Sequence, residues 1–203
     1  MLIQKYSLGQ LQANCYFIIQ NNECVIIDPA DEAEFILEKI QRENLKLTAL
    51  LATHGHFDHT MAVGEIQLSY DVPLYIHEAD LFLIKRLTET ARYFLGYEPA
   101  IIMPKNIEFF DKNNSKSHIS NFQFQIIHTP GHTPGSCCFY FPDEGALFTG
   151  DTLFKDAVGR TDLSYSSRDD LKKSLNKIAK LPEDTIVYPG HGDETTIDEE
   201  NLL

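Results

Sequence analysis

Long apolar runs, basic residues and paired cysteines are all scarce in this sequence. Its longest apolar runs reach five residues, at 15–19 and 137–141. A membrane-spanning helix needs roughly 18 or more apolar residues, so we expect no membrane helix and no membrane partner. The first ten residues also lack the basic and apolar stretches of a secretory signal.

Acidic residues outnumber basic ones. The chain of 203 residues has 17 Lys and Arg against 30 Asp and Glu, which gives a formal net charge of −13. Nucleic-acid binding is driven by Lys and Arg that neutralise phosphates, so we expect no nucleic-acid partner. The cysteines form no C-x-x-C pair, and an adjacent pair is a poor disulfide framework. They are interpreted as reduced thiols of a cytoplasmic protein, and they are Cys15, Cys24, Cys137 and Cys138.

The chain is long and apolar enough to build one hydrophobic core. It has 43% hydrophobic residues and no low-complexity tract, and a chain of this length buries roughly 70% of its unfolded surface on folding. We therefore expect one domain over residues 1–203. Residues 192–203 are too few for a separate carboxyl-terminal substrate-binding domain.

Hydrophobic periodicity predicts a chain of alternating strands and helices. Strands are predicted at 2–6, 14–19, 23–27, 45–52, 73–76, 107–110, 122–128, 136–140, 146–149 and 185–188. Helices are predicted at 35–43 (capped by Asp31), 61–70, 78–95 and 168–180, a flexible hairpin tip at 113–120, and nothing definite at 96–106. Two strand-rich halves, each followed by helix, favour an α/β or α+β fold with helices outside two sheets.

One polar motif stands directly after a predicted strand. Residues 54–59 read HGHFDH and contain His54, His56, Asp58 and His59. Loops at the carboxyl ends of strands are where the sites of α/β proteins gather. Imidazole with carboxylate is a ligand set that borderline divalent metals favour, so the motif predicts a metal site.

Three further ligand-type residues follow a predicted strand and a glycine. They are His132 in TPGHTPG, Asp151 in TGDT and His191 in YPGHG. Glycine permits close backbone approach, so the next short polar side chain is able to point into a cleft. The remaining histidines match no ligand position and are expected to pack or to face solvent; they are His77, His118 and His128.

These motifs, in this order, resemble those of the metallo-β-lactamase fold hydrolases, and among them the short, single-domain type of the glyoxalase II (hydroxyacylglutathione hydrolase) branch. The resemblance covers essentially the whole chain. It implies a four-layer αββα sandwich of two mixed β-sheets flanked by helices, with the site at one edge. It also implies two divalent metal ions, Zn²⁺ first, with Fe or Mn²⁺ as alternatives. By resemblance, the first ion is bound by His54, His56 and His132, the second by Asp58, His59 and His191, and both by Asp151.

The implied reaction is hydrolysis of a small thioester such as S-lactoylglutathione. Two close divalent ions lower the pKa of a shared water and so supply a bridging hydroxide. A thiolate leaves without a strong general acid, because thiol pKa values lie at about 8.5. Asp58 is nevertheless assigned a catalytic role as a proton carrier. Arg160 matches the position of a basic substrate-contacting residue in the family.

Other functions remain open from the sequence. A persulfide dioxygenase of the same fold would use one iron held by His54, His132 and Asp151, and another small-molecule hydrolase or a non-catalytic binding module would carry the same motifs. A secreted β-lactamase is disfavoured because a signal sequence is lacking. Residues 78–106 are a candidate lid over the site.

Overall fold

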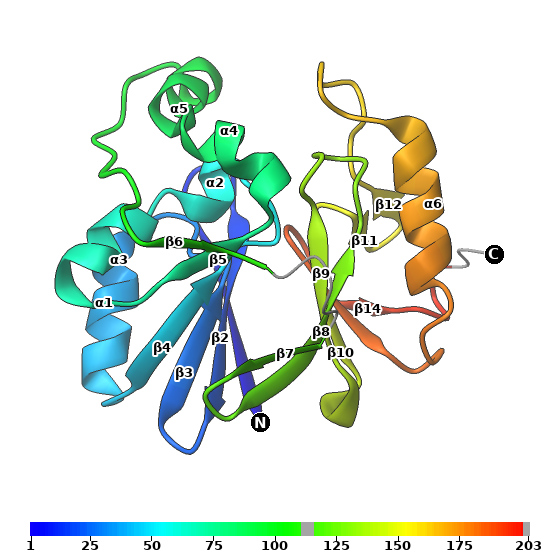
Figure 1. Ribbon diagram of the computed structural model, residues 1–203, viewed down its shortest axis with the longest axis horizontal. Coiled ribbons are helices and arrows are strands. Elements are labelled where there is room, and N and C mark those ends of the chain that lie inside the picture. The colour runs from blue at the N-terminus through cyan, green and yellow to red at the C-terminus, as the bar shows by residue number, and fades with distance from the viewer. Residues whose placement is uncertain (111–115, 201–203) are drawn as a thin grey trace.

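The computed structural model describes residues 1–110 and 116–200. Two six-stranded sheets pack face to face, and helices cover the outer face of each sheet (Figure 1). The layers therefore follow the order helix, sheet, sheet, helix. This is the four-layer αββα sandwich expected from the sequence.

The first sheet contains six strands in simple chain order. They are β1 (Leu2–Leu8), β2 (Ala13–Gln20), β3 (Glu23–Ile27), β4 (Lys46–Leu51), β5 (Leu74–Ile76) and β6 (Ile107–Phe109). The first three pair antiparallel, and β3 to β6 pair parallel. Parallel neighbours need a crossover, and helices α1 (Ala33–Arg42) and α3 (Val63–Ser69) lie in two of these crossovers on the outer face (Figure 1).

The second sheet has the order β14-β13-β10-β9-β8-β7. Its strands are β7 (Lys116–Ile119), β8 (Phe122–His128), β9 (Cys137–Phe141), β10 (Ala146–Gly150), β13 (Ile186–Pro189) and β14 (Thr195–Thr196). Strands β10 and β13 pair parallel, through the crossover helix α6 (Arg168–Ile178). A 3₁₀ turn, Pro142–Glu144, joins β9 to β10, and a small hairpin of β11 (Leu153–Phe154) and β12 (Ala157–Val158) follows β10.

Strand β2 carries a continuous apolar run because both of its faces are covered. Cys15 and Phe17 belong to the core beneath the helices, whereas Tyr16 and Ile18 belong to the core between the sheets. A strand covered on both faces carries apolar residues at successive positions. The core between the sheets is rich in aromatic rings, and Phe148 lies 5.0 Å from Tyr16 by ring centroids.

The single helix predicted at 78–95 is wrong. The structure has a 3₁₀ turn at Glu78–Asp80 and two short helices, α4 (Leu81–Ile84) and α5 (Leu87–Leu95). The backbone tightens after α4, where the Arg86 N–H donates to the carbonyl three residues earlier, 3.0 Å away. Because the segment is broken, the Asp80 side chain is buried toward the site while α5 keeps its own buried face.

Two smaller expectations also change. The helix predicted at 61–70 is α3, and a separate short helix, α2 (Phe57–Thr60), starts inside the histidine-rich motif. Asp31 does not cap α1, because the residue before this helix is Glu32 and the Asp31 carboxylate accepts from the Glu32 N–H.

The sequence predicts no helix or strand in three segments, and two of them contain a strand in the structure. The predicted flexible tip at 113–120 lies partly outside the described residues, and its described part contains strand β7. Residues 96–106 form neither helix nor strand, and the tail after His191 adds strand β14.

None of the helices in the two described ranges combines the length and the apolar character that a membrane crossing requires. The four cysteines are buried free thiols, as expected.

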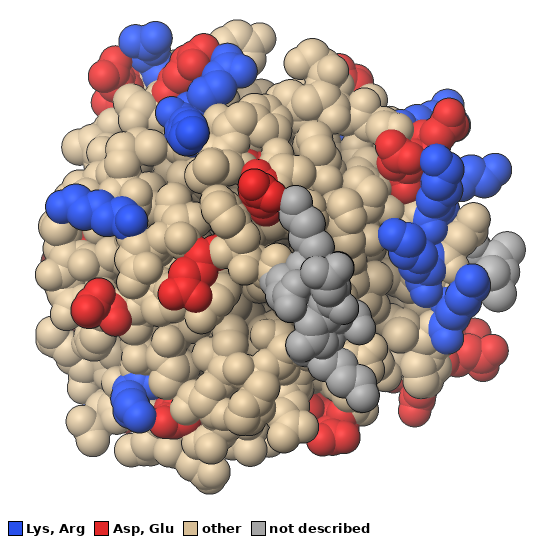
Figure 2. Space-filling view, viewed as in Figure 1, with Lys and Arg blue, Asp and Glu red and all other residues tan. Residues whose placement is uncertain are grey.

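Charged side chains are unevenly spread over the face seen in Figure 2. Lys and Arg gather along α6 and near α4 and α5, with Asp and Glu among them. Two of the α6 cations have partners, since Lys173 pairs with Asp170 at 2.9 Å and Lys177 donates to the His128 carbonyl.

Candidate metal centre

The predicted ligand residues meet at one edge of the sandwich because four strands from both sheets end there. The histidine-rich loop follows β4, the loop with His132 follows β8, Asp151 follows β10 and His191 follows β13. The loops pack so closely that one position needs glycine, since a Cβ on Gly190 would lie 2.4 Å from Asp151 Oδ1.

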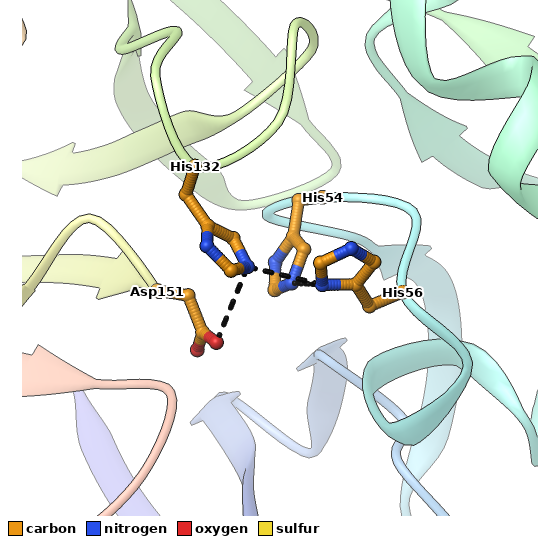
Figure 3. A group of neighbouring side chains, drawn as sticks. All are labelled: His54, His56, His132 and Asp151. Carbon is orange, nitrogen blue, oxygen red and sulfur yellow. Dashed lines mark hydrogen bonds and ion pairs between the residues drawn. The ribbon is translucent and has the colours of Figure 1, made fainter. Parts of the chain in front are cut away.

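Four of the predicted ligands form one tight group, drawn in Figure 3. One ligand atom from each of His54, His56, His132 and Asp151 lies within 4.8 Å of all the others. His56 Nδ1 is 3.1 Å from His54 Nε2 and 3.0 Å from His132 Nε2. Asp151 Oδ2 lies 3.4 Å from His132 Nε2. The ring nitrogens thus face one another around a common point.

The other three predicted ligands, Asp58, His59 and His191, form a second group with the same spacing limit of 4.8 Å. His59 Nε2 lies 3.3 Å from His191 Nε2, and His191 Nε2 lies 3.4 Å from Asp58 Oδ2. Asp151 Oδ1 is 3.3 Å from His59 Nε2 and 3.8 Å from His191 Nε2. The Asp151 carboxylate therefore presents one oxygen to each group.

Burial and mutual charge set the ionisation of these groups. Burial, and then a neighbouring imidazole, lower the pKa of His56 to about 4, and burial also lowers the pKa of His54. Burial would lower the pKa of His59 too, but the nearby carboxylates outweigh it and raise this pKa. Burial alone would raise the pKa values of Asp58 and Asp151, yet the surrounding histidines hold both below their usual range. Burial would also lower the pKa of His191, but Asp58 and Asp151 raise it. Metals bind neutral imidazoles and ionised carboxylates, so His59 and His191 are the ligand candidates that lose a proton most readily to an incoming ion.

A polar atom without a partner supports the fit of a metal to these side chains. Asp151 Oδ1 is buried and has no hydrogen-bond partner, although His59 Nε2 lies 3.3 Å away. A buried oxygen in that condition is costly unless something satisfies it. Histidine nitrogens and carboxylate oxygens that converge in this way are the ligand set of Zn, Fe or Mn ions.

Asp28 orients the second group, although it is not among the predicted site residues. Its Oδ2 accepts from His59 Nδ1 at 3.0 Å and from Thr53 Oγ1 at 2.7 Å, and its Oδ1 accepts from the Thr53 N–H. A hydrogen on Nδ1 leaves His59 Nε2 free to face the site. A signal for this role exists in the sequence, because Asp28 directly follows strand β3 as Asp151 directly follows β10.

Asp80 connects two loops of the first group and is likewise absent from the predicted site. Its carboxylate accepts from the Gly55 N–H at 2.9 Å, the Gly135 N–H at 2.6 Å and Thr133 Oγ1 at 2.6 Å. Burial raises the pKa of Asp80, against three hydrogen bonds that favour its ionised form. The donors belong to the histidine-rich loop and to the loop that contains His132, so one buried carboxylate joins both loops. The sequence predicts that Asp80 lies in a helix, and this prediction gives no indication that its carboxylate joins the two loops.

A cavity of about 300 Å³ opens onto both groups. Its walls combine ligand candidates with mostly apolar side chains. The lining residues are Leu11, His56, Phe57, Asp58, Thr90, Phe94, His132, Asp151, Arg160, Leu163, Tyr165 and His191. Helix α5 supplies Thr90 and Phe94, so the candidate lid segment forms part of the wall. Tyr93, on the same helix, is 81% exposed and lies outside this lining.

Arg160, predicted to contact substrate, lines this cavity but already has a partner. Its Nε donates to Asp162 Oδ1 at 2.7 Å and one terminal nitrogen donates to Asp162 Oδ2 at 2.8 Å. Its backbone carbonyl lies 3.0 Å from His132 Nδ1, which orients that imidazole. The other histidines lie outside both ligand groups, and His77 stacks on His128 with ring centroids 4.2 Å apart.

Known proteins match this chain over most of its length. The profile of the metallo-beta-lactamase superfamily matches residues 8–191. Hydroxyacylglutathione hydrolase GloC of Haemophilus influenzae is 34% identical, over 98% of this chain and 95% of the relative. The crystal structure of BLEG-1 B3 metallo-beta-lactamase superposes with a TM-score of 0.91 at 37% identity, over 98% of this chain and 96% of the other. That of TTHA1623 in a di-iron-bound form gives a TM-score of 0.88 at 37% identity, over 97% and 96%. The chain belongs to the metallo-beta-lactamase superfamily.

Proposed function

We propose that this protein is a dinuclear metal-dependent hydrolase that cleaves a small thioester, in the manner of glyoxalase II. The observation that carries the proposal is the Asp151 carboxylate, which presents Oδ2 to His132 and Oδ1 to His59. A mononuclear iron site would need only the first group. The second group, which His59 forms with Asp58 and His191, is equally compact and favours two ions.

The proposed ligands divide as the sequence resemblance implies. Bound divalent ions at such a site polarise a carbonyl and make hydroxide available at neutral pH. We assign Zn²⁺ to the site first. Iron is the alternative, because the similar protein TTHA1623 has a di-iron-bound form. One ion would be held by His54, His56 and His132, the other by Asp58, His59 and His191, and both by Asp151.

The protein's own residues arrange the remaining chemistry. Asp58 lines the cavity and has a lowered pKa, so it enters the reaction ionised and is our candidate proton acceptor. A departing thiolate is a weak base with a pKa of about 8.5, so the site needs no strong general acid. The likeness to GloC supports a thioester substrate.

A β-lactam is the second candidate substrate, because BLEG-1 is a B3 metallo-beta-lactamase and superposes with a TM-score of 0.91. Amide hydrolysis releases a far more basic leaving group than a thiolate, so it depends more heavily on proton delivery. Tyr165 lines the cavity and is the candidate proton donor for that reaction, and Asp58 would act as a donor only after it has accepted a proton.

The test combines metal analysis with turnover on one sample. Freshly purified protein is analysed for metals, then assayed with S-lactoylglutathione and with a β-lactam, beside a His56→Ala variant. About two metals per chain and thioester turnover lost in His56→Ala are expected. Turnover of the β-lactam alone would replace the thioester assignment. One iron per chain, with oxygen consumption on glutathione persulfide and no thioester turnover, would overturn the proposal in favour of a dioxygenase.

A further inference from the structure

Four large apolar side chains form part of the cavity wall. Leu11, Phe57, Phe94 and Leu163 line it, and the Phe57 and Phe94 rings stack with centroids 5.9 Å apart. Leu11 is 42% exposed and Phe94 is 49% exposed. Large apolar side chains left open to solvent inside a concave site indicate a ligand group that covers them.

A thiol carrier with carboxylate groups would need a free cation in the cavity, and the cation found there already has a partner. Arg160 is the one Lys or Arg side chain in the described lining of the cavity, and Asp162 binds it through both carboxylate oxygens. The guanidinium lowers the pKa of Asp162 to about 2, so this partner stays ionised throughout the pH range of an assay. The pair brings no net charge to the wall.

Two hydroxyl side chains also line the cavity, and that of Thr90 already bonds to the Arg86 and Leu87 carbonyls. Tyr165 Oη lies 2.8 Å from His56 Nε2, and its ring meets Phe82 edge-on with centroids 5.3 Å apart. His56 turns Nδ1 toward His54 and His132. When Nδ1 acts as the ligand atom, the ring hydrogen is on Nε2 and is donated to Tyr165. The hydroxyl hydrogen of Tyr165 is then available to a substrate in the cavity.

We propose that this cavity selects thioesters with an apolar acyl chain on an uncharged thiol, anchored by the Tyr165 hydroxyl, over thioesters of carboxylated carriers. The inference rests on the proposed function and specifies its substrate class. Each methylene that enters an apolar cavity contributes about 0.8 kcal/mol, equivalent to about fourfold in kcat/KM. The carboxylates of such carriers would meet a wall without an unpaired cation.

The kinetic test uses metal-replete protein and a series of N-acetylcysteamine thioesters with acetyl, butyryl and hexanoyl groups, beside hexanoyl-glutathione. We expect kcat/KM to rise about fourfold per methylene, and the uncharged carrier to be preferred. Phe94→Ala should flatten the dependence on chain length. Phe109→Ala, a matched phenylalanine substitution at a 42% exposed position of β6 outside the described lining, should leave the dependence unchanged. A flat series in the parent protein, or a preference for glutathione, would overturn the inference.

A binding experiment separates failure of this inference from failure of the proposed function. Calorimetric titration of the metal-replete protein with hexanoate and with acetate measures the cavity without any turnover. Hexanoate should bind at least about tenfold more tightly than acetate, and Phe94→Ala should remove the difference while Phe109→Ala keeps it. Equal dissociation constants would exclude an apolar site even if thioesters are hydrolysed. A retained difference without thioester turnover would instead count against the proposed reaction.

Discussion

The Asp28 carboxylate holds Nδ1 of His59 at 3.0 Å and thereby directs Nε2 of that imidazole toward Asp151 Oδ1, 3.3 Å away. Asp28 takes φ +51° at the end of β3, a conformation that Asp tolerates better than most residues. Its link to the histidines of the first ligand group runs through Thr53, whose hydroxyl lies 3.0 Å from His54 Nδ1. Asp28 therefore offers a way to perturb one proposed ion more than the other.

Asp28→Asn should weaken the second metal more than the first. An amide has one acceptor oxygen in place of a carboxylate's two, and three donors from Thr53 and His59 converge here. Removing such an outer partner typically costs about 10–100-fold in metal affinity. Competitive chelator titration should show two separated binding steps. Parallel weakening of both steps would contradict this division of roles.

Asp151→Asn should weaken both metals together. The substitution removes the charge that is shared by the two groups, whereas the other proposed ligands each serve one group. Loss of an outer partner already costs about 10–100-fold, so for this shared ligand we expect kcat to fall at least about 100-fold and metal content to fall well below two per chain. Elemental analysis and steady-state kinetics on the same preparation measure this. His118→Ala, at an exposed position of β7, is the control expected to retain both properties. Full metal content in Asp151→Asn would refute the shared role.

Asp80→Asn should loosen the first metal and the fold at the same time. The Asp80 carboxylate accepts hydrogen bonds from three donors, in Gly55, Gly135 and Thr133. In the asparagine variant the amide nitrogen cannot accept, so it would face one of these donors without a hydrogen bond. Leaving a buried donor unsatisfied costs about 1–3 kcal/mol. We expect a lower denaturation midpoint for the metal-free variant and a weaker first binding step. Unchanged values of both quantities would show that Asp80 neither stabilises nor positions the loops.

The four cysteine thiols should be unreactive toward thiol reagents in the native protein. Burial raises the pKa of Cys138 to about 11 and that of Cys24 to about 12, and it raises the pKa values of Cys15 and Cys137 as well. A raised pKa disfavours the thiolate, which is the reactive form, so at about pH 8 little thiolate is present. A disulfide-exchange reagent should titrate the four thiols only after denaturation. A fast reaction with the native protein would contradict this.

The sequence by itself determined which residues make the candidate site. Motif spacing and resemblance single out seven ligand candidates, and the structure brings their side chains into two adjoining groups. They are readable from sequence because each lies in a loop or short helix that follows a strand, and strand ends show in short-range patterns. The layered fold is predictable for the same reason, since strands such as β2 and β9 are continuous apolar runs. The seven are His54, His56, Asp58, His59, His132, Asp151 and His191.

Only the tertiary structure decided how those residues are held and what faces the cavity. Asp80 lies 25 residues from Gly55 and 55 from Gly135, and no local pattern reports a hydrogen bond across such separations. The segment predicted as one helix at 78–95 is a 3₁₀ turn followed by two short helices, and it buries Asp80. Arg160 is predicted from position alone, but its pairing with Asp162 depends on the folded loop. Motif spacing specifies which atoms are able to bind, whereas orientation and access arise from contacts between segments distant in the chain.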